Sequence, residues 1–160
     1  MRLMPTLEGG MRIEIETPTD WLVLEQIAPD ALDGGNDRLP QRLGALMDEQ
    51  SDWEGVVIPE LKSFFTGQIS CVVEGVKRGQ ESVDLGKEEA SGEVFITKED
   101  ADNWYGALNQ ARLALEARYK FGQSEEIEDL EEFGDDKRSA FVRNRFYSAL
   151  QGVLLEYVID

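Results

Sequence analysis

The chain has 160 residues, about the size of one domain, and carries a formal net charge of −17. Such a field repels phosphate groups, so nucleic acids and anionic membranes are disfavoured partners, whereas a basic protein or a divalent cation is allowed. The sequence contains no histidine, which excludes Ser-His and Cys-His nucleophile pairs and the usual zinc sites. Its single cysteine, Cys71, rules out an internal disulfide and fits a reducing cytoplasm.

The first ten residues lack the features of a targeting segment. No long apolar run follows Arg2, so a signal peptide is not expected. No segment of the chain has the roughly 20 consecutive apolar residues of a membrane span. A Gly9-Gly10 pair precedes a second Met-Arg sequence at residues 11–12. We therefore expect residues 1–10 to be a loosely held extension and residues 11–160 to form a single domain.

The domain begins with a predicted strand and helix. Residues 11–16 alternate between apolar and polar side chains, as a half-buried strand does. Thr17 suits the N-cap of the helix that follows, and Asp20 can complete a capping box with it. We expect Pro29 to end this helix, because proline is unfavourable in a helix interior.

Two more helices are predicted before the middle of the chain. The first covers residues 40–49, and the second covers residues 59–77. The second has an apolar stripe that includes one polar residue: Leu61, Phe65, Gln68, Val72 and Val76. Residues 79–92 are polar without an apolar period, which is typical of an exposed loop.

The second half predicts a short strand and two long helices. Residues 93–97 form the strand, which can pair with residues 11–16 in a small ribbon. One helix follows from Lys98 to about residue 121, with Thr97 and Asp100 as a capping box. Another covers about residues 137–158. The fold class is therefore mainly α: a single compact bundle of about five to six helices with a two-stranded β ribbon.

One cation falls inside the apolar stripe of the helix that begins at Lys98. Arg112 lies one turn from both Leu108 and Leu115, so it does not face water directly. Three explanations remain open. The guanidinium reaches the edge of the core, it pairs with a carboxylate of another helix, or it binds an anion or ligand. Because an unpaired buried cation costs several kcal/mol, a partner is expected.

The last helix repeats apolar residues at helical spacing. The stripe consists of Val142, Phe146, Leu150, Val153 and Tyr157, with Leu155, Val158 and Ile159 on the other side. Core packing explains this pattern. The alternative is a surface for a partner or for a homodimer through this C-terminal helix, because exposed apolar clusters need covering.

Two segments resemble a known family. The first contains Ile96-Thr97, Ala101, Trp104, Ala107-Leu108-Asn109, Arg112-Leu113, Leu115 and Arg118. The second contains Phe146-Tyr147, Leu150-Gln151 and Leu154-Leu155. Together they resemble an uncharacterised bacterial family, catalogued as a domain of unknown function, number two thousand and seventeen. Phe146 stands where that family often has tryptophan.

This resemblance implies a mainly helical fold and no assigned activity. Asn109, Arg112 and Gln151 match polar positions of the family's motif, and we take Trp104 and Arg118 as further candidate structural or interaction residues. Genes of the family often lie near the gene for the adaptor of the Clp protease in actinobacteria. The resemblance thus implies a role in regulated proteolysis.

An acidic segment precedes the last helix. Residues 125–136 hold eight acids in twelve residues, and residues 137–145 hold four cations and no acid. One explanation is a short acidic helix held in place by its apolar residues and neutralised by the basic stretch. The other is a docking segment for a basic partner. Its candidate contacts are Glu126, Ile127, Asp129, Leu130 and Phe133. A calcium loop is not expected, because the alternating ligands and central glycine of an EF-hand are absent.

No group in the sequence points to catalysis. Cys71 lies on the flank of an apolar stripe and is expected to be an inert small residue. We expect a non-catalytic, cytoplasmic protein that binds another protein, with the Clp protease machinery as a candidate partner and without a metal or cofactor. The alternative is a hydrolase whose divalent metal is held only by carboxylates.

Overall fold

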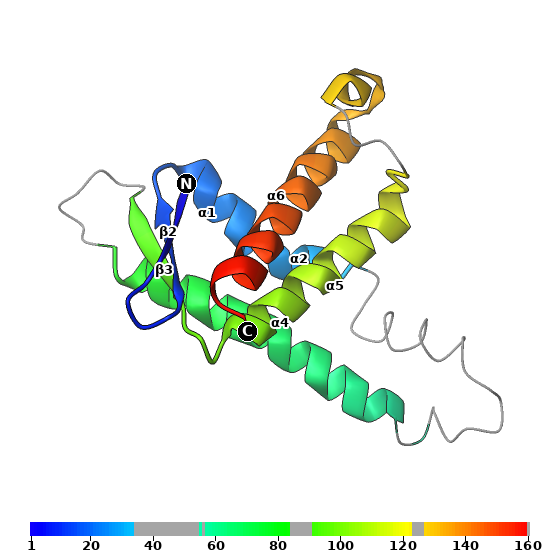
Figure 1. Cartoon of the computed structure of the whole chain (residues 1–160). Helices are drawn as coiled ribbons and strands as arrows, with labels where there is room; N and C mark the ends of the chain where they lie inside the picture. Colours follow the sequence, from blue (N-terminus) through cyan, green and yellow to red (C-terminus); the bar gives the residue numbers. More distant parts are fainter. Residues whose placement is uncertain (34–54, 56, 84–90, 123–126, 160) are drawn as a thin grey trace.

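The computed structural model describes residues 1–33, 55, 57–83, 91–122 and 127–159, and it shows a mainly helical chain with a small antiparallel sheet (Figure 1). The elements are β1 (Arg2–Pro5), β2 (Met11–Ile15), α1 (Pro18–Glu25), α2 (Ile27–Ala31), α4 (Ile58–Glu81), β3 (Gly92–Ile96), α5 (Ala101–Tyr119), the 3-10 helix η2 (Ile127–Glu132) and α6 (Asp135–Tyr157). The predicted fold class is confirmed as mainly helical with a small sheet. The predicted helix over residues 40–49 lies outside the described residues. In the part of the chain that is described, no helix has the length and apolarity to cross a membrane.

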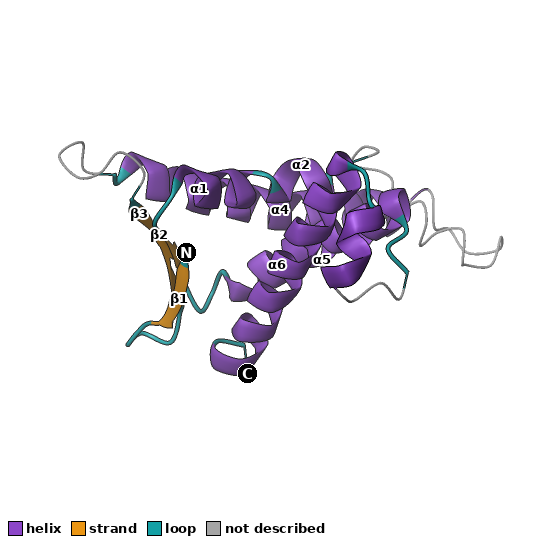
Figure 2. Cartoon of the chain, turned by 90° about the horizontal axis from the view of Figure 1, so that it is seen from above, coloured by secondary structure: helices purple, strands orange, loops and turns teal. Residues whose placement is uncertain are grey.

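The sheet has three strands rather than the two that we expected. Its order is β1-β2-β3, and both neighbouring pairs are antiparallel. Strand β2 alternates as predicted, with Met11, Ile13 and Ile15 buried. The expectation of a loosely held extension over residues 1–10 is wrong, because β1 pairs with β2 and the terminal ammonium lies 2.8 Å from Glu16 Oε2. The sheet lies to one side of the helices (Figure 2).

The first helix begins as predicted and ends differently. The backbone N–H of Asp20 donates to Thr17 Oγ1 at 3.3 Å, and the Asp20 carboxylate accepts from the backbone N–H of Thr17 at 3.0 Å. These bonds complete the predicted capping box. Pro29 does not end the helix. The break falls at Gln26, and Pro29 lies in the first turn of α2. Backbone N–H groups in a first turn have no intrahelical acceptor, so a proline is tolerated there.

Helix α4 is longer than the sequence predicted and lies close to its neighbours. It continues to Glu81, so the expected loop over residues 79–92 begins later. Two of its glycines permit the close approach. A Cβ on Gly75 would lie 3.0 Å from Trp104 Cζ2, and one on Gly79 would lie 2.7 Å from the backbone oxygen of Glu93. Only Gln68, Val72 and Val76 of the predicted stripe are buried, because the helix extends past the core at its N-terminal end (Figure 1).

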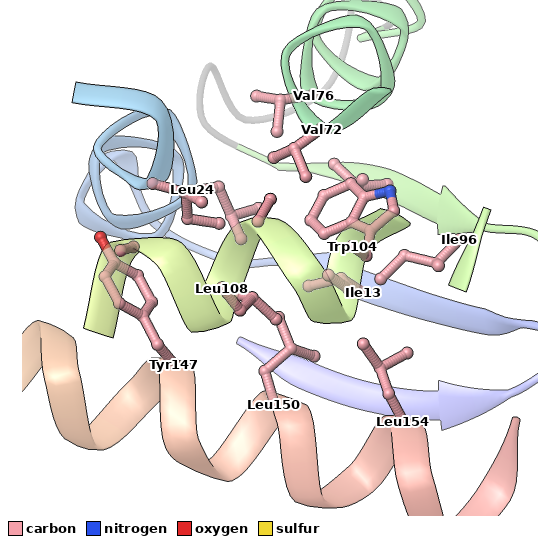
Figure 3. Close-up of a cluster of buried hydrophobic side chains, with 14 of the residues drawn as sticks. Ile13, Leu24, Val72, Val76, Ile96, Trp104, Leu108, Tyr147, Leu150 and Leu154 are labelled. Atoms are coloured by element: carbon pink, nitrogen blue, oxygen red, sulfur yellow. The ribbon is translucent and has the colours of Figure 1, made fainter. Parts of the chain in front are cut away.

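Helix α5 forms the centre of the core. Leu108 and Leu115 of the predicted stripe are buried, and so is Trp104. Trp104 and Leu108 pack between residues of α4, the sheet and α6 (Figure 3). The helix begins three residues later than expected. The N–H of Asp100 donates to Thr97 Oγ1 at 3.1 Å, but this bond closes a turn before the helix, whose N-cap is Asp100 itself.

The predicted stripe of α6 is wrong in most of its members. The buried face consists of Ala140, Phe141, Tyr147, Leu150, Gln151, Leu154 and Val158. Val142 and Tyr157 are more than half exposed, and Phe146 and Val153 are only half-buried. The helix has two apolar faces, and sequence periodicity does not tell which of them the other helices cover. The view in Figure 2 places α6 on the side of the molecule away from α4.

Candidate functional site

An apolar groove lies between the α1–α2 pair and α4. It consists of two adjoining pockets, of about 260 Å³ and about 310 Å³, which share Ala28 and Val73. The apolar side chains that line them are Leu24, Ala28, Leu32, Ile69, Val72, Val73 and Val76. Along α4 the groove extends from Thr66 to Gln80. At 1.5 Å per residue this is roughly 21 Å, or about four helical turns.

The groove follows from the residues that face each other across it. Val72 and Val76 are buried toward the core, whereas Val73, on the neighbouring side of the same helix, remains 47% exposed. Opposite Val73 stands Ala28, whose single methyl group does not fill the space between the helices. An apolar floor therefore remains open to solvent, which is typical of a site that binds apolar groups.

Acidic groups outnumber cations at the rim of this groove. Among the described residues, the charged side chains that line it are Glu25, Glu74 and Lys77, and all three are exposed. At one end the side-chain amide of Gln80 donates to the Glu25 carboxylate and so joins α4 to α1. The chain has a net charge of −17, and two glutamates lie beside the apolar floor. Both features favour an occupant with apolar and cationic side chains.

Arg112 has an amide partner rather than a carboxylate. Its Nη1 donates to Gln151 Oε1 at 2.6 Å, and Gln151 Nε2 donates to the backbone oxygen of Tyr105 at 3.1 Å. Arg112 itself is half-buried, and its Nε is buried without a hydrogen-bond partner. Among the described residues no carboxylate pairs with Arg112. The geometry therefore matches an arginine that reaches the edge of the core, with Gln151 as its anchor.

The other predicted site residues do not gather around Arg112. Asn109 is exposed, and Trp104 is a core residue packed on Gly75. Arg118 lies at the end of α5, where its Nη1 is 3.3 Å from Asp33 Oδ1 and its guanidinium lies 5.2 Å from the centre of the Tyr119 ring. Of the three polar positions implied by the family resemblance, only Arg112 and Gln151 contact each other.

The acidic segment is tied to α6 by its backbone and its apolar residues. Arg138 Nε donates to the Leu130 carbonyl at 3.1 Å, and Arg138 Nη2 donates to the Phe133 carbonyl at 3.2 Å. The centres of the Phe133 and Phe141 rings lie 5.8 Å apart, and Lys137 Nζ lies 4.2 Å from the centre of the Phe133 ring. Leu130 also packs against the core. These contacts favour a held segment over a free docking peptide.

Three candidate contacts of that segment are described less fully. Glu126 lies outside the described residues, and Ile127 and Asp129 are described only as part of η2.

A buried ionic cluster was not foreseen from the sequence. Arg143 donates from Nε and Nη2 to the two oxygens of Asp30, at 2.7 and 2.9 Å. The hydroxyl of Tyr147 donates to Asp30 Oδ2 at 2.7 Å. The bond to Asp30 raises the pKa of Arg143, and burial, reinforced by the Asp30 charge, raises the pKa of Tyr147. The only sequence signal was the spacing of Arg143 and Tyr147, one helical turn apart.

Burial and neighbouring charges set the reactivity of Cys71. Burial, together with the neighbouring Asp100 carboxylate, raises the pKa of the Cys71 thiol to about 11. The thiol is therefore neutral at physiological pH and a poor nucleophile. Within the described residues, no three side chains among Asp, Glu and Cys come together as metal ligands.

Comparison with known proteins gives one match. Residues 6–158 match the family described as a domain of unknown function (DUF2017). No curated protein and no solved structure matches the chain.

Proposed function

Because the chain belongs to the DUF2017 family, which has no assigned function, we propose from its groove that it is a non-catalytic, cytoplasmic protein-interaction protein. The groove between α1–α2 and α4 binds a partner helix that carries apolar residues on one face and cations beside them. The single observation that carries the proposal is the exposed apolar floor around Ala28 and Val73. The Clp protease machinery, implied by the family resemblance, is the first partner to test.

The dimensions and charge of the groove support this choice of partner. A groove of about four turns accommodates a helix that presents apolar residues at positions i, i+3 or i+4, and i+7. Glu25 and Glu74 at the rim attract cations on the flanks of such a helix, and the net charge of −17 speeds its approach. The one cation at the rim, Lys77, lies 3.9 Å from Glu81, which offsets its charge.

The test is a comparison of three baits in the lysate of the native host. Val73→Asp places a charge on the groove floor. Leu113→Asp is its matched control, since Leu113 is also an exposed apolar residue on a helix, at 39% against 47%, and lies outside the groove. We expect the wild type and Leu113→Asp to retain a Clp adaptor or chaperone, and Val73→Asp to lose it. Equal capture by all three baits, or no binding of purified Clp components to the wild type, contradicts the proposal.

The alternative is a metal-dependent hydrolase that uses only carboxylates. Nothing in the described residues favours it, because no group of acids there is arranged to hold a metal ion. Metal analysis of the same purified bait tests this directly. One tightly held divalent ion per chain would favour the hydrolase over the protein-interaction function.

A further inference from the structure

The outer face of α6 carries a second apolar stripe that the described elements leave partly uncovered. Its members are Val142, Phe146, Ala149, Val153 and Tyr157, separated by steps of four, three, four and four residues. At about 100° per residue they lie within one narrow face of the helix. Val142 is 54% exposed and Tyr157 is 55% exposed. Phe146 and Val153 are half-buried and pack against the edge of the core.

We propose that this α6 face binds the same face of a second copy of the chain, in an antiparallel pair with twofold symmetry. The order of side-chain sizes along the stripe is suited to such a pair. With the axis next to Ala149, Val142 lies opposite Tyr157 of the second copy, and Phe146 lies opposite Val153. Each pair joins side chains that are large enough to make contact across the helices.

Small residues occupy the point where the two helices come closest. Ala149 is exposed, and a Cβ on the nearby Gly152 would meet no atom within 4 Å. The centre of the stripe is therefore free of bulk, which allows the two backbones to approach. A close approach of the two backbones favours association only because exposed apolar residues lie on either side of it.

The charges beside the stripe select the antiparallel arrangement. Arg145 and Glu156 are both exposed and lie on the same flank of the stripe. They are too far apart to meet within one helix, because eleven residues span roughly 16 Å. In an antiparallel pair the same flanks meet, and Arg145 lies beside Glu156 of the second copy. In a parallel pair opposite flanks meet, so Arg145 would not lie beside Glu156 of the second copy.

The expected association is modest in strength. The stripe from Val142 to Tyr157 is roughly 23 Å long, and a single pair of helices buries less than most stable dimer interfaces. The net charge of −17 on each copy also opposes association. At physiological salt the Debye length is about 8 Å, so the charges on distant surfaces are largely screened, whereas the α6 contacts are not.

Sedimentation velocity over a concentration series into the high micromolar range tests the dimer. We expect the wild type to convert from monomer to dimer. Ala149→Arg places two like charges beside the axis and should weaken dimerisation by about tenfold or more, a difference of about 1.4 kcal/mol. Val73→Asp, the groove variant, should dimerise like the wild type. A wild type that stays monomeric throughout, or an Ala149→Arg variant that dimerises equally, overturns the proposal.

A charge exchange tests the antiparallel arrangement separately. Arg145→Glu and Glu156→Arg should each weaken the dimer, because each places like charges together. The double exchange should restore it to near the wild-type dissociation constant. Because each single variant also removes any contact of its side chain within the monomer, the coupling between the two changes is the informative quantity. Strictly additive effects would show that the two residues do not meet.

Discussion

Asp30 of α2 and Arg143 of α6 lie 113 residues apart in the chain and are joined by two parallel hydrogen bonds, of 2.7 and 2.9 Å. Asp30 is only 5% exposed and accepts a third bond from Tyr147. A buried carboxylate with these bonds fixes how α6 meets α2, because a shift of either helix would break a charge-assisted bond.

Removal of the Asp30 charge should therefore be costly. Asp30→Asn leaves the Arg143 guanidinium without its carboxylate and should lower the free energy of unfolding by about 3 kcal/mol. Tyr147→Phe removes one hydrogen bond and leaves the ion pair in place, so its cost should be about 1 kcal/mol. Urea denaturation of both variants measures the difference. An Asp30→Asn variant no less stable than Tyr147→Phe would show that the pair does not hold the two helices together.

The Arg112–Gln151 contact can be tested as a pair. Arg112→Leu leaves the Gln151 oxygen without its donor, and Gln151→Leu leaves the guanidinium without its acceptor, so each should cost about 1–3 kcal/mol. The double change replaces both with apolar side chains and should be nearly neutral. A double-mutant cycle from thermal or urea unfolding gives the coupling energy. If the two costs simply add, the hydrogen bond seen at 2.6 Å does not matter for stability.

Two glycines of α4 should respond in opposite directions to the same substitution. Gly67→Ala adds a methyl group with no atom within 4 Å and should stabilise the helix by about 0.5–1 kcal/mol. Gly79→Ala gains the same helix propensity but forces a methyl group to within 2.7 Å of the Glu93 carbonyl. We expect a net loss of about 1–3 kcal/mol. A stabilised Gly79→Ala protein would mean that α4 and β3 are not in such close contact.

The thiol of Cys71 should lose its proton only at high pH. Burial and the Asp100 carboxylate raise its pKa from 9.0 to about 11. Because the folded pKa is the higher one, the stability that the neutral thiol contributes is complete below about pH 9 and is lost as the pH rises through about 11. The rate of alkylation by iodoacetamide, measured against pH, should have its midpoint near 11 in the folded protein and near 9 in urea. The same midpoint in both states would contradict this assignment.

The sequence predicted well those features that depend on local chemistry. The capping box of Thr17 and Asp20, the alternation of β2 and the stripe of α5 each follow from neighbouring residues, and each appears in the structure. Strand β1 was missed because its residues do not alternate clearly. Its strand conformation comes from pairing with β2, a contact that short-range patterns do not contain.

Most of the candidate site could not be predicted from the sequence, because it depends on contacts between distant segments. Periodicity identified apolar residues on α6 but did not tell which of two faces is covered. Asp30 followed a proline that we expected to end a helix, so its burial against Arg143 could not be inferred. The groove arises where Ala28 faces Val73, and neither residue carries a signal of its own. Only Arg112 stood out, since a cation in an apolar stripe needs an explanation.

Site-specific photo-crosslinking can show whether the groove binds an apolar and cationic helix. A photoreactive phenylalanine derivative at Val73 should crosslink, in cells of the native host, to one partner segment that mass spectrometry can identify. The same group at Leu113, an exposed residue of α5, is the control outside the groove. We expect a crosslinked segment with apolar residues at helical spacing and basic flanks, obtained from position 73 alone. An acidic or non-helical segment, or equal products from both positions, would contradict it.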